Sequence, residues 1–74
     1  MSNDNASDIE VTLNGERRRL SEGVTLLEVV MQGYASTKGV AAAVNGEVVP
    51  KSAWQDEVLQ PEDRIEILTI AQGG

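Results

Sequence analysis

The sequence predicts a small α+β domain, in which a mixed sheet of four to five strands packs against one main helix. Two Asn-Gly dipeptides, at 14–15 and 45–46, each separate short apolar runs. They indicate β-hairpins, because this dipeptide accepts the positive φ angles of a type I′ turn. A capping-box pattern between the hairpins starts one helix. The most apolar segment, residues 65–70, comes last and is typical of a strand at the centre of a sheet.

The first hairpin is predicted from residues 9–20. Residues 9–13 alternate apolar and polar side chains, which is the period of a half-buried strand. The strand that returns after the turn, residues 16–20, contains Arg17, Arg18 and Arg19. Such charge is typical of an edge strand, where it discourages unwanted pairing. A phosphate or nucleic-acid site is the other interpretation, but one basic strand in an acidic chain gives it little support. The sequence leaves open whether these arginines contact a partner.

The helix is predicted over residues 26–32. Thr25 and Glu28 form the S/T-x-x-E capping box, in which each side chain satisfies a backbone amide of the first turn. Val24 and Val29 occupy the positions of a hydrophobic staple. The apolar face at helical spacing is then expected to comprise Leu26, Leu27, Val30 and Met31. Gly33 suits the left-handed residue that ends many helices.

The second hairpin is predicted from residues 40–44 and 47–49. Pro50 cannot donate to a strand ladder and therefore ends the second strand. Residues 51–54 fit one short helical turn that lays Trp54, the only tryptophan, over the core. Val58 and Leu59 are expected to pack beneath the same segment. Pro61, Glu62 and Asp63 form a turn that leads into the final strand, residues 64–70.

Two hairpins that flank one crossover helix, with the last strand in the middle, describe the β-grasp fold. The domain is expected to span residues 9–70. Residues 1–8 are polar and are expected to form a disordered arm, and residues 71–74 a flexible tail that ends in Gly-Gly.

Composition excludes several classes of function. The chain has no cysteine and no histidine, so it lacks a thiolate nucleophile, the usual general base at neutral pH and the commonest metal ligands. No metal site, cofactor or catalytic residue is therefore expected in the chain itself. The net charge of −6 argues against nucleic acid and anionic membranes as partners. The start has neither the basic nor the apolar region of a signal peptide, and no apolar run is long enough to span a bilayer. We expect a cytoplasmic protein.

The tail is the candidate functional segment. Its residues are Ala71, Gln72, Gly73 and Gly74. Glycine lets a chain pass close to the surface of another protein, so this end suits insertion into a narrow active site. If Ile65 and Ile67 face the helix, then Leu68 and Ile70 lie on the open face of the sheet. An apolar patch there would be a protein-docking surface beside the tail.

The terminal carboxylate of Gly74 is the only distinctive reactive group that the sequence offers. A carboxylate resists nucleophilic attack, and conversion to an acyl adenylate removes that obstacle by providing a leaving group. Because the chain has no phosphate-binding loop and no nucleophile, another protein would perform the activation. The chain would then be a substrate and carrier.

The residues also carry a resemblance to a known family. Residues 44–54, VNGEVVPKSAW, residues 59–67, LQPEDRIEI, and the terminal Gly73-Gly74 resemble the ThiS family of sulfur carriers in thiamine biosynthesis. The similarity covers residues 9–74. The family usually has Asp-Gly-Asp where this chain has Pro61-Glu62-Asp63, which changes one turn.

The resemblance implies that a ThiF-like adenylyltransferase uses ATP to adenylate Gly74. A sulfur donor, such as a cysteine desulfurase or a relay protein, then converts the adenylate to a thiocarboxylate. Thiazole synthase, the ThiG-like partner, takes that sulfur when it builds the thiazole ring. Gly74 would carry the sulfur, and Gly73 would let the tail enter a narrow channel.

Three alternatives stay open at this point. The small subunit of molybdopterin synthase shares the fold, the tail and the thiocarboxylate, but tends to be longer and to carry phenylalanines, which this chain lacks. A ubiquitin-like modifier would be joined to lysines through Gly74. A plain interaction domain would make no use of its glycine end.

Overall fold

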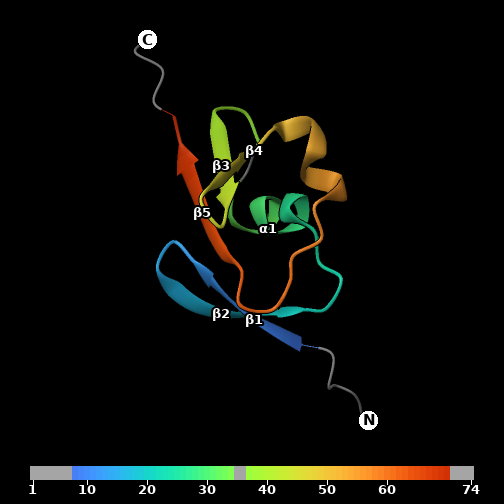
Figure 1. Cartoon of the computed structure of the whole chain (residues 1–74). Helices are drawn as coiled ribbons and strands as arrows, with labels where there is room; N and C mark the ends of the chain where they lie inside the picture. The colour runs from blue at the N-terminus through green and yellow to red at the C-terminus, as the bar shows by residue number, and fades with distance from the viewer. Residues whose placement is uncertain (1–7, 35–36, 71–74) are drawn as a thin grey trace.

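The computed structural model describes residues 8–34 and 37–70. They form a five-stranded mixed sheet with one α-helix and one 3₁₀ helix on the same face (Figure 1). The elements in chain order are β1 (Asp8–Leu13), β2 (Glu16–Ser21), α1 (Leu26–Gly33), β3 (Val40–Val44), β4 (Glu47–Val49), the 3₁₀ helix η1 (Lys51–Asp56) and β5 (Arg64–Thr69). This is the predicted β-grasp arrangement, with five strands.

The strand order is β2-β1-β5-β3-β4, which places β5 in the middle and β2 at an edge, as predicted. β5 runs parallel to β1 and antiparallel to β3, and each hairpin is antiparallel. β5 therefore joins the two hairpins, as Figure 1 shows. The core lies between the sheet and the two helices, where the buried apolar residues are Ile9, Val11, Val24, Leu26, Val29, Val30, Val40, Ala42, Val44, Trp54, Leu59, Ile65 and Ile67.

Both Asn-Gly turns adopt the predicted conformation. The φ angles are 50° at Asn14 and 84° at Gly15, and 54° at Asn45 and 84° at Gly46. Positive φ at both central residues is what a type I′ turn requires. The dipeptides thus set the register of both hairpins, Leu13 opposite Glu16 and Val44 opposite Glu47.

The start of α1 also follows the prediction. The Glu28 amide donates to Thr25 Oγ1 at 3.2 Å, and the Thr25 amide donates to Glu28 Oε1 at 2.9 Å. The segment after η1 adds a cap that the sequence pattern did not reveal, because the Leu26 amide donates to the carbonyl of Glu57 at 2.8 Å. The helix is therefore fixed at its N-terminus both locally and by the chain that covers it.

The end and the exposed face of α1 differ from the prediction. Gly33 is the last helical residue and lacks a positive φ, and Tyr34 caps the helix in an extended conformation. The helix thus leaves directly into extended chain and needs no left-handed glycine. Met31 was expected on the apolar face but is 56% exposed, because Val29 takes its place in the core. Val58 is exposed as well, and Leu59 alone of that pair is buried.

Three strand boundaries shift by one residue. β1 begins at Asp8, which pairs with Ser21, so Asp8 joins the sheet rather than the expected arm, and β2 continues through Ser21. β5 ends at Thr69, but the amide of Ile70 still donates to the carbonyl of Gly39 at 2.6 Å. The pairing with the β3 segment therefore continues in the same register for one residue beyond the end of β5.

Candidate functional site

The predicted docking residues lie on the face of the sheet that the helices leave open. Ile65 and Ile67 are buried beneath α1, whereas Leu68 is 65% exposed and Ile70 is 53% exposed. This is the alternation predicted for the final strand. The tail residues Ala71, Gln72, Gly73 and Gly74 lie outside the described residues.

A third exposed apolar side chain joins this surface from β4. Val48 is 74% exposed and pairs with Ala43, and Ala41 pairs with Leu68. The two alanines of β3 thus lie between Val48 and Leu68, and their small side chains keep the surface between them shallow. We call Ala41, Ala43, Val48, Leu68 and Ile70 the open-face patch. Exposed apolar side chains that gather on one face in this way are typical of a protein interaction site.

Val48 was not predicted to be part of this surface. The signal was present in the alternation of β4, because Val49 packs against the core and its neighbour must therefore point to the other face. The pairing of β3 with both β4 and β5 then brings Val48 and Leu68 onto one surface.

The other half of the open face is charged. Arg17 of β2 donates from Nη1 to Glu62 Oε1 at 3.0 Å, and from Nη2 to Glu62 Oε2 at 3.1 Å and to Glu10 Oε1 at 2.6 Å. Arg19 adds a longer contact to Glu10 at 3.4 Å. Arg17 thus connects β1, β2 and the turn that precedes β5.

These contacts shift the pKa values of the groups involved. Hydrogen bonds from Arg17, with a smaller effect from Arg19, lower the pKa of Glu10 below its usual value. The bidentate contact with Arg17 lowers the pKa of Glu62 as well. Glu62, and then Glu10, raise the pKa of Arg17. All three arginines of β2 are therefore paired with carboxylates within the molecule, since Arg18 contacts Glu16, and this weakens their interpretation as a phosphate or nucleic-acid site.

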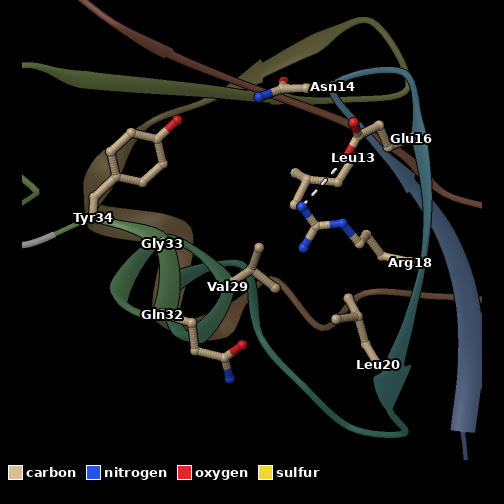
Figure 2. Close-up of a pocket in the computed structure, with 9 residues that line it drawn as sticks. All are labelled: Leu13, Asn14, Glu16, Arg18, Leu20, Val29, Gln32, Gly33 and Tyr34. Atoms are coloured by element: carbon tan, nitrogen blue, oxygen red, sulfur yellow. Dashed lines mark hydrogen bonds and ion pairs between the residues drawn. The ribbon is translucent and has the colours of Figure 1, made fainter.

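A pocket of about 550 Å³ lies on the opposite face, between α1 and β2 (Figure 2). Its apolar lining includes Leu13, Leu20 and Val29, and Tyr34 and Arg18 also line it. Arg18 contacts Glu16 at 3.5 Å within this lining. The pocket offers no paired acids or nucleophile, and no group of three or more metal-ligating side chains occurs within residues 8–34 and 37–70. Neither described helix is long and apolar enough to cross a membrane.

A model of the ThiS family matches residues 11–74, which is most of the chain. The chain belongs to the ThiS family. It is 41% identical over 64 residues to the sulfur carrier protein ThiS of Thermus thermophilus, covering 86% of this chain and 98% of that protein. The crystal structure of the thiamine biosynthesis protein ThiS from Geobacter metallireducens superposes with a TM-score of 0.76 at 25% identity, covering 89% of this chain and all of that one.

A further ThiS-like match lies within a larger protein. This chain is 29% identical over 66 residues to a thiazole synthase of Paramagnetospirillum magneticum, covering 89% of this chain and 20% of that protein. A segment the size of a ThiS domain is therefore part of a thiazole synthase polypeptide in that organism.

Proposed function

We propose that this chain carries sulfur for the synthesis of the thiazole moiety of thiamine, with the sulfur held as a thiocarboxylate on Gly74. The observation that carries the proposal is the match to the ThiS family, which extends to residue 74 and so includes Gly73 and Gly74. The chain acts as a carrier and not as a catalyst. The proposal keeps the cytoplasmic location that the sequence predicts.

The chemistry begins at the terminal carboxylate. One carboxylate oxygen of Gly74 attacks the α-phosphate of ATP in the active site of a ThiF-like enzyme, and pyrophosphate leaves. The terminal sulfur of a persulfide on a separate donor protein then attacks the acyl carbon and displaces AMP. A thiol reduces the resulting acyl disulfide, so that the S–S bond to the donor breaks and the thiocarboxylate is released. The absence of a side chain at Gly73 and Gly74 keeps that carbon open to the nucleophile.

Thiazole synthase is the proposed acceptor of the sulfur. The thiazole synthase of P. magneticum contains a ThiS-like segment, and this supports the assignment. When a carrier and the enzyme that it supplies are linked in one polypeptide, each is present at a high effective concentration for the other. We assign docking onto the adenylyltransferase to the open-face patch, in particular to Leu68 and Ile70, which lie just before the tail.

Intact-mass spectrometry tests the proposal directly. Incubation with a ThiF-like enzyme, ATP and a sulfur donor should give a product in which one oxygen of the chain is replaced by sulfur. Deletion of Gly74, or one residue appended after it, should abolish the product while the fold survives. An unmodified chain in the presence of a demonstrably active enzyme would contradict the carrier function, and lysine-linked conjugates in extract would favour a protein modifier.

The docking surface has a matched pair of variants. Leu68→Asp places a charge in the open-face patch, and Met31→Asp places the same charge on an exposed apolar residue of α1, across the sheet. Loss of one central apolar contact should lower the rate of sulfur loading by about tenfold or more in Leu68→Asp only. Equal loading of the two variants, at equal melting temperature, would exclude the patch.

A genetic test separates thiamine synthesis from the related molybdenum cofactor pathway. Deletion of the gene should produce a requirement for thiamine that added thiazole relieves. A defect in molybdenum enzymes instead would assign the chain to molybdopterin synthase.

A further inference from the structure

The side chain of Asn14 occupies the place of a peptide group in the sheet. The ladder between β1 and β5 ends where Leu13 pairs with Ile65. Beyond it, the Asn14 amide donates to the carbonyl of Ile65 at 2.9 Å. The side-chain Nδ2 then donates to the carbonyl of Ile67 at 3.2 Å, and Oδ1 accepts from the Ile67 amide at 2.8 Å. The carboxamide thus extends the parallel pair to Ile67.

The same residue has a reactive neighbour. An asparagine followed by glycine is prone to cyclise, because the backbone nitrogen of the glycine is unhindered. The nitrogen of Gly15 attacks Cγ of Asn14, the bond from Cγ to the side-chain nitrogen breaks, and ammonia leaves. Water then opens the succinimide to aspartate or isoaspartate. Asn14 is exposed and lines the pocket of Figure 2, so water reaches it, and residues other than its chain neighbours leave the space beside Gly15 open.

We propose that Asn14 is a deamidation site, and that its modification breaks the hydrogen bonds that hold the end of β5 to the first hairpin. In the folded protein the two hydrogen bonds to Ile67 hold the carboxamide along β5 and so retard its attack by Gly15. After conversion to aspartate, an oxygen replaces the Nδ2 donor and faces the Ile67 carbonyl oxygen. Isoaspartate in addition lengthens the backbone of a turn whose two-residue length fixes the register.

Loss of the hydrogen bonds from Asn14 affects the end of β5, which contributes Leu68 to the open-face patch. Leu68 and Thr69 pair with Ala41 and Val40 of β3. In the part of the chain that the structure describes, the hydrogen bonds between Asn14 and Ile67 are the contact of the first hairpin that lies furthest along β5. Its loss leaves the end of the strand held from one side.

Asn45 provides an internal control, since it has the same dipeptide and a similar φ. Its Oδ1 accepts from the Arg64 amide at 2.9 Å, and its Nδ2 donates to Asp63 Oδ1 at 2.9 Å. The Asn45 carboxamide therefore holds one backbone amide and the side chain of Asp63, whereas the Asn14 carboxamide holds both the amide and the carbonyl of Ile67. Modification there affects the start of β5 and leaves its end in place.

The test combines peptide mass spectrometry with hydrogen exchange on the full chain. During incubation at neutral pH, Asn14 should deamidate at least about tenfold more slowly in the folded protein than in the chain unfolded in urea. In Asn14→Asp, exchange of the Ile67 amide should accelerate by about tenfold while that of Arg64 stays constant. Asn45→Asp should show the reverse.

Asn14→Gly keeps the left-handed turn and removes the carboxamide, so it tests the tie even if the charged variant fails to fold. It should also accelerate exchange at Ile67. Unchanged exchange at Ile67 in Asn14→Gly, or equal deamidation rates at Asn14 in the folded and unfolded chains, would overturn the proposal. None of these measurements depends on sulfur loading, so their failure leaves the proposed function standing.

Discussion

Glu62 shows how contacts can hold a single residue in an unfavourable backbone conformation. It has a φ of 69°, a left-handed conformation that a side chain disfavours. It lies in the turn Pro61-Glu62-Asp63, where the resemblance led us to expect Asp-Gly-Asp. Arg17 holds both carboxylate oxygens of Glu62, and the Glu62 amide donates to the carbonyl of Glu10 at 2.6 Å. These contacts hold the turn in a shape that glycine adopts unaided.

Substitution of Glu62 by glycine and by alanine separates the backbone from the side chain. Both variants lose the contact with Arg17, but only glycine adopts a positive φ without steric cost. Glu62→Gly should therefore melt about 5 °C above Glu62→Ala. Thermal unfolding followed by circular dichroism measures the difference, and equal melting temperatures would show that the turn carries no strain.

The pairing of Arg17 with Glu10 and Glu62 should make stability depend on pH. Both carboxyl groups have pKa values below the usual 4.5 in the folded protein, so near that pH the unfolded chain binds more protons. Their contribution is complete above the usual value and is lost as the pH falls through the lowered folded values. The free energy of unfolding should therefore decline between about pH 5 and pH 3, and more steeply in the wild type than in Arg17→Gln.

Arg18→Gln is the matched control for this prediction. It removes the same charge from the same strand but leaves the contacts of Glu10 and Glu62 in place. Urea titrations at several pH values should give it the slope of the wild type. A wild-type slope in Arg17→Gln would show that the ion pairs do not stabilise the fold.

Among the elements, α1 illustrates what local sequence can predict. Its start depends on Thr25 and Glu28, which are three residues apart and interact within one turn, so the pattern was sufficient. Its end depends on how the chain leaves toward β3, and the glycine signal at Gly33 was wrong because Tyr34 is extended. Its buried face depends on the position of the sheet, which decides that Val29 is buried and Met31 is exposed.

The sheet shows the same difference between features that neighbouring residues decide and features that distant residues decide. The dipeptides at 14–15 and 45–46 predicted both hairpins, because a type I′ turn is decided by two adjacent residues. The side-chain ties of Asn14 and Asn45 to β5 were not predictable, since their partners lie 53 and 19 positions away in the chain. The exposure of Leu68 and Ile70 on the open face followed from alternation, but the position of Val48 beside them required the order of the strands.

The capping box gives a prediction for the element as a whole. Thr25→Ala removes the acceptor for the Glu28 amide and should lower the free energy of unfolding by about 1 kcal/mol. Thr25→Ser keeps a hydroxyl in the same place and should lose much less. Urea denaturation measures both. Equal losses would mean that the contact between Leu26 and the carbonyl of Glu57 suffices to hold the start of the helix.

For the whole molecule, Trp54 is the largest fully buried side chain in the part of the chain that the structure describes. It is 1% exposed, and its Nε1 donates to the carbonyl of Val49 at 2.7 Å. It thereby attaches η1 to the end of β4 and to the core beneath α1. In a domain this small, whose total stability is on the order of 3–5 kcal/mol, a single side chain of this size is a large share of the core.

Trp54→Ala should cost about 3–5 kcal/mol and leave the domain largely unfolded at 37 °C. Trp54→Phe keeps an aromatic ring but leaves the Val49 carbonyl without its donor, and should cost about 1–3 kcal/mol. Circular dichroism and thermal unfolding distinguish the two. A folded Trp54→Ala with a melting temperature near that of the wild type would show that η1 is dispensable.

The central position of β5 also determines when the domain can fold during its synthesis. The ribosome makes the two hairpins and the helix first, but the hairpins have no strand in common until residues 64–69 are added. The contacts that complete the sheet are therefore among the most distant in the chain, a topology that slows folding. A nascent chain that stalls before β5 is left with two unjoined hairpins and exposed apolar surface, which makes it a substrate for chaperones and proteases. The strand that carries the patch thus also ensures that only chains translated through it reach the folded state.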